Sequence, residues 1–211
     1  EVAEEHGGDV AELSDLKGFD LSENGLIDGF VASHRHKLRF DHDVGKWFVW
    51  NGKRWERNST QLAHEYARQL SIKVALTDPK SPAVKTLKRV STWEAIERGA
   101  RRVAPLATTS SIWDADPWLL GTPGGTVDLR TGDLREARQS DFITKQTAIA
   151  PIPLSKFDPA KHCPTWLAFL DFATGEDAAA IRFLQQWLGY SLTGDTREQA
   201  LLFVHGPGGS G

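Results

Sequence analysis

The chain has 211 residues, a length that fits one large domain or two small ones. Hydrophobic residues make up 40%, charged residues 25% and aromatic residues 9%, a globular composition that excludes a disordered or collagen-like chain. No stretch approaches the ~18 consecutive apolar residues of a spanning helix, and the first residues lack the features of a signal peptide. Cys163 is the only cysteine, so an internal disulfide is impossible. We therefore expect a cytoplasmic protein without membrane contact.

The net charge of −3 conceals a strong segregation of charge along the chain. Residues 1–34 hold nine acidic residues and one basic residue, whereas residues 35–105 hold sixteen basic and seven acidic residues. Residues 106–211 hold eight basic and twelve acidic residues. The middle segment, with a net charge of +9, indicates a basic face, for which nucleic acid is the commonest partner. A solvated face whose charge the acidic segments offset after folding fits equally well.

Residues 1–21 are acidic and low in aromatic residues, which predicts a tail or linker. Ser22 can serve as the N-cap of a first helix. That helix places four residues on one face: Ile27, Phe30, Val31 and His34. His34, His36 and His42 have no cysteine or carboxylate at ligand spacing, so we expect no metal site there.

The clearest hairpin signal is Asn51-Gly52, a pair that suits a type I′ turn. It predicts strands at 46–50 and 53–55, and residues 38–41 can add a third strand. The hairpin is rich in tryptophan and basic residues. Its tryptophans could stack on bases in a basic groove, or they could build a small β core; these are Trp47, Trp50 and Trp55.

Two further helices are predicted by apolar residues at helical spacing. The first follows Thr60, with Leu62, Tyr66 and Leu70 four residues apart. The second runs from about Thr92, with four residues inward: Trp93, Ile96, Ala100 and Val103. Its outer side carries Arg98, Arg101 and Arg102, which could grip phosphates or form a solvated face.

The second half of the chain begins with a Gly/Pro-rich β region at 118–135, and strand character resumes at 142–150. Pro164 suits the first position of a helix that ends at Thr174-Gly175. Glu176 and Asp177 suit the start of another helix. We expect that helix to bury four residues: Ile181, Leu184, Leu188 and Leu192.

The chain closes with an apolar strand at 200–205 and a glycine-rich run. A strand followed by Gly206, four residues and Gly211 matches the first six positions of a phosphate-binding P-loop. Glycines there let backbone N–H groups converge on phosphate oxygens. A flexible linker is the alternative interpretation.

Several longer motifs resemble the phage and plasmid primase–helicase family. They are residues 116–134 (DPWLLGTPGGTVDLRTGDL), 141–145 (DFITK), 157–159 (FDP), the pair Cys163-Pro164, and 183–196 (FLQQWLGYSLTGDT). Members share the domain found before the helicase core of the poxvirus primase–helicase. The resemblance implies an ATP-driven, DNA-translocating motor of helicase superfamily 3, commonly with a primase upstream. It also implies ring assembly, with a helical collar before the P-loop.

We therefore expect an α+β fold: a small β-hairpin-rich module with surrounding helices, then a helical collar leading into the first strand of a P-loop ATPase domain. The expected divisions are the tail or linker at 1–21, a poxvirus-primase-like domain at 22–160, the collar at 161–198 and a truncated ATPase domain at 199–211.

The expected function is to support ring assembly, as a hexamer, and DNA engagement within a phage- or plasmid-type primase–helicase of a bacterial host cell. The parent enzyme would use ATP and Mg²⁺, whereas this fragment alone would be inactive and hold no cofactor. The alternative is a non-catalytic DNA-binding or assembly module with a linker tail, and Lys followed by Ser or Thr after Gly211 would favour the motor. The partial ATP site is Gly206, Pro207, Gly208, Gly209, Ser210 and Gly211. The DNA-contact candidates are Lys46, Lys53, Arg54, Arg57, Arg98, Arg101 and Arg102.

Overall fold

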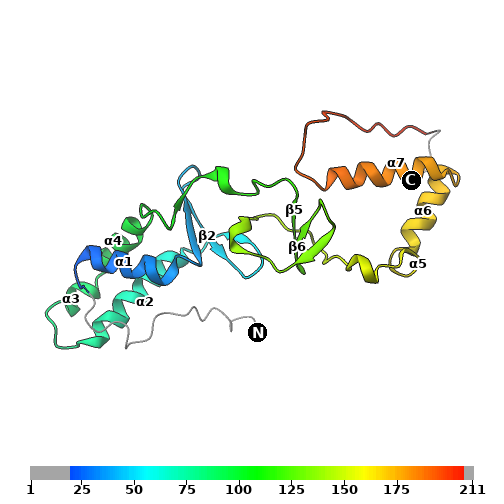
Figure 1. Ribbon diagram of the computed structural model, residues 1–211. Coiled ribbons are helices and arrows are strands. Elements are labelled where there is room, and N and C mark those ends of the chain that lie inside the picture. The colour runs from blue at the N-terminus through cyan, green and yellow to red at the C-terminus, as the bar shows by residue number, and fades with distance from the viewer. Residues whose placement is uncertain (1–19, 207–211) are drawn as a thin grey trace. The chain divides into compact units, whose positions relative to one another are not determined.

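A computed structural model describes residues 20–206 and has the expected α+β character (Figure 1). Those residues divide into two compact units. The first contains the described residues up to Asn51 together with Trp55–Trp113. The second contains Gly52–Arg54 and the described residues from Asp114 onward.

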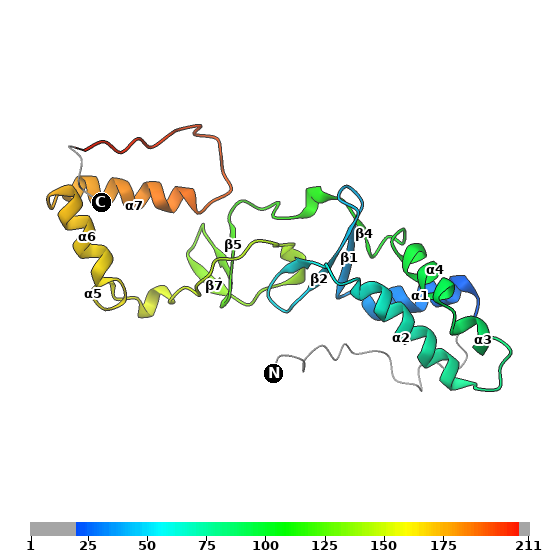
Figure 2. The same cartoon turned by 180° about the vertical axis from the view of Figure 1, so that it is seen from behind.

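Four helices of the first unit lie together in both views (Figures 1 and 2). They are α1 (Glu23–His34), α2 (Leu62–Thr77), α3 (Val84–Leu87) and α4 (Val90–Ala100). The predicted start of α1 is confirmed, because the Ser22 hydroxyl accepts a hydrogen bond from the Gly25 N–H at 3.1 Å. A side-chain oxygen at this position satisfies a donor that the first helical turn leaves open.

The sheet of the first unit has the strand order β3-β2-β1-β4. Its strands are β1 (Leu38–Asp41), β2 (Lys46–Trp50), β3 (Trp55–Arg57) and β4 (Ala107–Thr108). Strand β4 pairs parallel to β1, and the other pairs are antiparallel. The core combines apolar residues of the sheet with those of the helices, including Phe30, Leu38, Tyr66, Leu70, Ile96 and Leu106.

The hairpin forms where it was expected, but the two-residue type I′ turn is wrong. Trp50 pairs with Trp55, so residues 51–54 make a four-residue loop. Only Gly52 of the Asn51-Gly52 pair has a positive φ, 92°. This register places Trp55 in the core, fully buried, with its ring centroid 5.7 Å from that of Trp50. Burying the large indole outweighs the local turn preference.

Asp41, at the end of β1, is a fully buried carboxylate. It accepts hydrogen bonds from the Ser110 hydroxyl and the Trp113 indole N–H, both at 2.8 Å, and from the Asp43 backbone N–H at 2.9 Å. Burial by itself raises its pKa, but these bonds and one from Val44 outweigh burial and hold the pKa below its ordinary value. Asp41 therefore joins the β1–β2 turn to the segment after β4.

The second unit contains a three-stranded antiparallel sheet in the order β5-β6-β7. The strands β5 (Leu119–Thr122), β6 (Gly125–Asp128) and β7 (Asp133–Arg135) confirm the predicted β region. Short 3₁₀ helices occur at Ser110–Ile112 in the first unit and at Gln139–Asp141 and Leu154–Lys156 in the second.

The strand expected at 142–150 is wrong. Side-chain bonds replace a ladder there, because the Asp114 carboxylate accepts from the Thr144 N–H at 2.8 Å and from the Lys145 N–H at 3.4 Å. The Thr147 N–H donates to the Gly121 carbonyl at 3.0 Å. Two of these backbone donors are thus satisfied by a side chain and one by a single bond to β5, so no ladder of strand hydrogen bonds forms.

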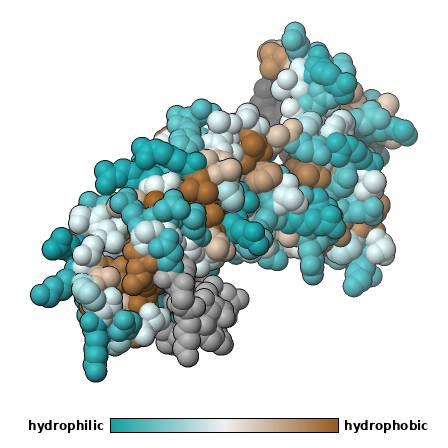
Figure 3. All heavy atoms as spheres, turned by 60° about the vertical axis from the view of Figure 1, so that its left-hand side comes forward, coloured by the Kyte–Doolittle hydropathy of each residue, from teal (hydrophilic) through white to brown (hydrophobic). Residues whose placement is uncertain are grey.

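Helices α5 (Pro159–His162), α6 (Pro164–Thr174) and α7 (Ala178–Ser191) follow. Pro164 and Gly175 mark the ends of α6 as predicted, and the Asp177 carboxylate caps α7. The expected burial of four residues of this helix is wrong: Ile181 and Leu184 are partly exposed, and Leu188 and Leu192 are 48% and 52% exposed. Other large apolar residues of α6 and α7 are also exposed: Trp166, Phe169, Phe172 and Phe183. Brown, apolar groups reach the surface at several places in Figure 3.

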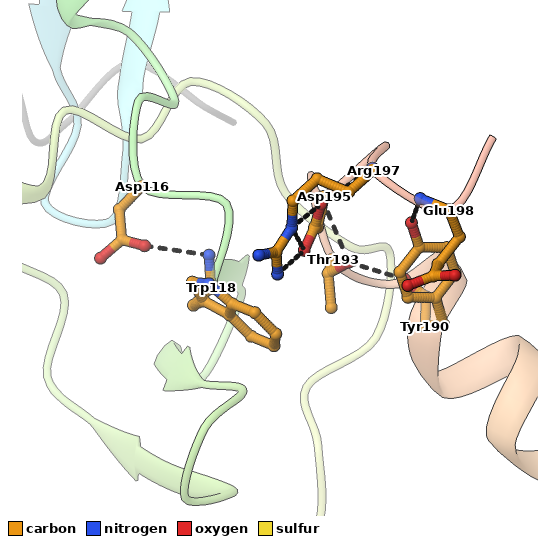
Figure 4. Close-up of polar contacts among 7 residues, drawn as sticks. All are labelled: Asp116, Trp118, Tyr190, Thr193, Asp195, Arg197 and Glu198. Atoms are coloured by element: carbon orange, nitrogen blue, oxygen red, sulfur yellow. Dashed lines mark hydrogen bonds and ion pairs between the residues drawn. The ribbon is translucent and has the colours of Figure 1, made fainter.

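The segment after α7 belongs to the second unit, and Figure 4 shows the polar contacts that it makes within itself and with Tyr190 of α7. The Gly194 N–H donates to the Pro117 carbonyl at 2.9 Å, and the Thr193 hydroxyl donates to the Tyr190 carbonyl at 2.8 Å. Arg197 binds the Asp195 carboxylate, and the Glu198 N–H donates to the Tyr190 hydroxyl at 3.3 Å.

The strand expected at 200–205 is not confirmed. Residues 199–206 have no regular secondary structure, and Leu201, Phe203 and Val204 are about four-fifths exposed or more. A strand needs a neighbour to satisfy its backbone groups, and no strand in the described residues pairs with this segment.

Candidate nucleic-acid interface

The first unit contains a groove with a volume of about 910 Å³, which we call the basic groove. Four cationic side chains line it: Lys46, Arg57, Arg98 and Arg101. Two acidic side chains, Glu94 and Glu97, also line it, so the cations outnumber the anions. The remaining lining residues are Phe40, Gly45, Trp47, Asn58, Ser59, Gln61, His64 and Val90.

The cations come from three elements that the fold brings together. Lys46 begins β2, and Arg57 ends the neighbouring strand β3. Arg98 lies in the last turn of α4, and Arg101 is its C-cap residue. Lys46, Arg57 and Arg98 are exposed, so their charged groups are available to a ligand in solution.

Glu97 does not act as a free negative charge in this groove. Its side chain is 8% exposed and binds the Arg101 guanidinium twice, at 2.9 Å to Nε and 2.7 Å to Nη2. The Trp47 indole N–H donates to the same carboxylate. The Arg101 guanidinium also lies over the Phe40 ring, 4.9 Å from its centroid. The two bonds to Glu97 hold the Arg101 guanidinium in one orientation. Because a guanidinium has five N–H donors, others remain for a further anion.

A neighbouring contact holds the backbone of Arg101. His42 Nε2 lies 2.8 Å from the Arg101 carbonyl oxygen, which ties the β1–β2 turn to the end of α4. The groove wall at Arg101 is therefore fixed by both its side chain and its main chain. Pre-organised cations lose less conformational entropy when they bind a phosphate.

The groove brings together four of the seven cations that the sequence suggested as DNA contacts. Arg102, directly after Arg101, is exposed but does not line the groove. Lys53 and Arg54 belong to the second unit, where Arg54 Nη1 lies 3.5 Å from the Thr144 carbonyl. Sequence reasoning therefore identified the charges but not which of them share a surface.

Sequence reasoning missed the neutral side of the groove. Asn58, Ser59, Gln61 and His64 surround the start of α2. The Asn58 side chain accepts from the Leu62 N–H at 2.8 Å, and Gln61 adopts a left-handed φ of 58°. A run of Asn, Ser and Thr before a helix is a recognisable capping signal, although it does not reveal what the loop faces.

The tryptophans of the hairpin contribute mainly to the core. Trp47 is 6% exposed and Trp55 is fully buried, while Trp50 is partly exposed. The Arg39 guanidinium also lies over the Trp55 ring, 5.1 Å from the ring centroid, in a cation–π contact. These contacts support the interpretation as a small β core and leave little tryptophan surface for base stacking.

His34 also has a structural role. Its ring is buried, stacks on Tyr66 at 4.7 Å between centroids, and places Nδ1 2.9 Å from the Phe30 carbonyl. Burial lowers its pKa, since the charged form loses hydration. Within residues 20–206, no group of three or more His, Cys, Asp or Glu side chains is arranged to hold a metal ion.

The sequence predicted a partial ATP-binding loop at 206–211. Gly206 is exposed, and Pro207, Gly208, Gly209, Ser210 and Gly211 lie outside the described residues. No helix in the described part of the chain is long and apolar enough to span a bilayer.

Part of the chain matches a known protein family. Residues 28–175 match the family described as D5 N terminal like, which covers more than half of the chain and includes every residue of the basic groove. A search of curated proteins found no match.

Proposed function

Because the chain belongs to the D5 N-terminal-like family, found in phage, plasmid and poxvirus primase–helicase proteins, we propose that its first unit binds DNA through the basic groove. The contact would be made to the phosphate backbone and would be independent of base sequence. The family assigns the chain to a region associated with primase–helicases, and the groove supplies the chemistry for the more specific proposal.

The observation that carries the proposal is the convergence of Lys46, Arg57, Arg98 and Arg101 on one concave surface. Arginine and lysine contacts to phosphate oxygens position a protein on nucleic acid without reading its sequence. The bidentate Glu97 contact orients Arg101 while its remaining N–H groups stay available. Neutral polar side chains that line the groove, such as Asn58 and Ser59, can add hydrogen bonds to the sugar–phosphate backbone.

The direct test compares two charge reversals in the full chain. Arg98→Glu with Arg101→Glu reverses two groove cations, and Lys85→Glu with Lys88→Glu reverses two exposed cations of the same unit outside the groove. Both double variants change the net charge equally. Binding of a fluorescein-labelled oligonucleotide is measured by anisotropy at several salt concentrations, with circular dichroism to check folding.

We expect the groove variant to weaken binding at least about tenfold at low salt. Its salt dependence should also become less steep, because each lost phosphate contact on a single strand removes about 0.7 from the slope of log K against log salt. The control variant should lose clearly less affinity. Equal losses in the two variants would show a diffuse charge effect and refute the groove as the site.

Ring assembly and ATP binding, which the family resemblance implies for the parent protein, are part of the same proposal. The apolar faces of α6 and α7 would serve ring assembly, and Gly206–Gly211 would bind ATP with Mg²⁺ in a parent enzyme that unwinds DNA. A protein that continues past Gly211 should hydrolyse ATP, and Gly211→Val should abolish this activity because a branched side chain would block close approach of the backbone to phosphate. A folded, longer protein that binds no ATP would favour the alternative, a DNA-binding or assembly module.

A further inference from the structure

The basic groove has a floor of nearly buried residues. Phe40, Trp47 and Glu97 line the groove although each is only 6% exposed, and we call these three residues the floor. The Arg101 guanidinium binds the Glu97 carboxylate and lies over the Phe40 ring. The positive charge of Arg101 is therefore held at the floor, inside the groove.

The other three cations of the groove lie at its mouth. Lys46, Arg57 and Arg98 line the groove but remain exposed, and we call these three residues the rim. A ligand that rests on the protein surface can meet the rim, whereas a ligand must enter the groove to meet Arg101. The two sets of cations can therefore distinguish a wide polyanion from a narrow one.

The groove is too small for a DNA duplex to enter. Its volume of about 910 Å³ corresponds to a cube with an edge of about 10 Å, which is narrower than the major groove alone of B-DNA, about 12 Å wide. A short duplex is also stiff, so it can contact only the rim. A single strand is narrower and bends easily, so its phosphates can reach Arg101 at the floor.

Uncharged side chains of the groove suit unpaired bases. Val90, the first residue of α4, lines the groove and is 54% exposed. Its apolar side chain offers no bond to a phosphate, but it can pack on the face of a base. The His64 ring and the Gln61 amide line the same groove and can stack on an unpaired base or bond to its edge. In a duplex the faces are stacked and the pairing edges are occupied, so these side chains would find no partner.

We propose that the basic groove binds one unpaired DNA strand in preference to a duplex, with Arg101 on its phosphates and Val90 on its bases. This inference rests on the proposed function, because it names the form of DNA that the groove takes. Electrostatics alone predicts the opposite preference. A duplex carries one negative charge per ~1.7 Å of its axis, so a surface that is merely basic should bind it at least as tightly as a single strand.

The first test compares the two forms of DNA on the full chain. A fluorescein-labelled strand of about 20 nucleotides that cannot fold on itself is measured by anisotropy, alone and as its blunt duplex, at one salt concentration. We expect the single strand to bind at least about fivefold more tightly, because only its bases are free to make contacts.

The outcomes of this first test separate the inference from the proposed function. Equal affinity for the two forms, or tighter binding of the duplex, would overturn the inference and leave DNA binding by the groove intact. Absence of binding to either form would refute both.

The second test removes the contact to the bases. Val90→Ser replaces the apolar side chain, and Val44→Ser is the matched control, because Val44 is 51% exposed and does not line the groove. We expect Val90→Ser to weaken single-strand binding about threefold and to change duplex binding less than about 1.5-fold. Val44→Ser should leave both affinities unchanged, and circular dichroism checks that both variants are folded. Equal losses of single-strand affinity in the two variants would overturn the contact between Val90 and the bases.

The third test separates the floor from the rim. Arg98→Gln and Arg101→Gln each remove one positive charge. Arg98→Gln should weaken binding of both forms by a similar factor, whereas Arg101→Gln should reduce the preference for the single strand by about threefold or more, since only that form reaches the floor.

Two measurements guard the third test against loss of structure, because Arg101→Gln leaves the buried Glu97 carboxylate without its charged partner. Urea unfolding shows whether the variant is folded under the binding conditions. Arg101→Lys keeps the charge and should retain most of the preference for the single strand. A preference that is unchanged in folded Arg101→Gln would overturn the inference that a strand enters the groove.

Discussion

Glu97 is the residue whose replacement tests most sharply how the basic groove is organised. In Glu97→Gln the amide keeps one oxygen for the Trp47 indole but loses the charge and one of the two bonds to Arg101. Hydrogen bonds to charged groups contribute roughly 1.5–3 kcal/mol each. Arg101 is 40% exposed, so water compensates part of the loss. We expect the free energy of unfolding of the first unit to fall by about 1.5 kcal/mol.

Urea unfolding followed by tryptophan fluorescence measures this change, fitted with separate transitions where the two units unfold independently. With a urea dependence of about 1–1.5 kcal/mol per M for a unit of this size, the midpoint should fall by about 1–1.5 M. Glu94→Gln is the control, because Glu94 is exposed, lines the same groove and lies one turn earlier on α4. Its midpoint should stay within about 0.5 M of the parent.

The same two variants separate positioning from simple charge in DNA binding. Each removes one negative charge from the groove, so electrostatics alone predicts equal gains in affinity. If Glu97 orients Arg101, Glu97→Gln should bind oligonucleotide more weakly than Glu94→Gln, by about threefold or more. Identical affinity and identical urea midpoints in the two variants would refute the argument that Glu97 pre-organises the groove.

Three further predictions concern the packing that supports each unit. Gly99→Ala should destabilise the first unit by about 1–3 kcal/mol in urea unfolding, because its Cβ overlaps Ile27, and Ile27→Val should recover part of the loss. Gly125→Ala should destabilise the second unit by at least about 2 kcal/mol, since Gly125 has a φ of 135° and a Cβ there would overlap the Arg135 carbonyl; Gly132→Ala, at a φ of 80° with no atom near its Cβ, should cost about 1 kcal/mol. Burial raises the pKa of Asp141, but the bonds and charge of Arg135, together with bonds from Arg138 and Thr126, outweigh it and hold the pKa below its ordinary value. The stability from Asp141 should therefore be present above about pH 4 and be lost as the pH falls through the folded-state pKa, and Asp141→Asn should flatten this part of the stability profile.

Local signals in the sequence predicted the regular elements well where the chain itself decides them. Ser22, Pro164 and Asp177 begin helices because their side chains or rings suit the first helical turn. The apolar and aromatic residues at 38–41 and 46–50 also formed strands in the expected places. These features depend on neighbours within a few residues, which a sequence displays directly.

The wrong predictions depend on partners that are distant in the sequence. Residues 142–150 have strand-like composition, but Asp114, about 30 residues earlier, takes their backbone donors. Leu188 and Leu192 have helical spacing, yet no element in the described residues covers them. Periodicity indicates which face is apolar, but it does not supply the surface that buries that face.

The candidate site, too, was predicted from the sequence only where local signals were enough. The excess of basic residues between 35 and 105 was evident from composition, and four of its members do line one groove. The bidentate contact between Glu97 and Arg101 has helical spacing and could have been noticed. The indole bond from Trp47, fifty residues earlier, has no sequence signal, so the role of Glu97 emerged only from the structure.

The partners of Asp41 have a consequence for how the chain acquires its structure during synthesis. The hydroxyl and indole that satisfy this buried carboxylate come from Ser110 and Trp113, 69 and 72 residues further along. The parallel strand β4 that completes the sheet also lies beyond α4. While the ribosome is still making α2 or α4, the nascent hairpin therefore holds an ionised side chain that cannot be buried without cost. The first unit should become protease-resistant in one late step, once Trp113 has left the exit tunnel, rather than gradually as each helix emerges.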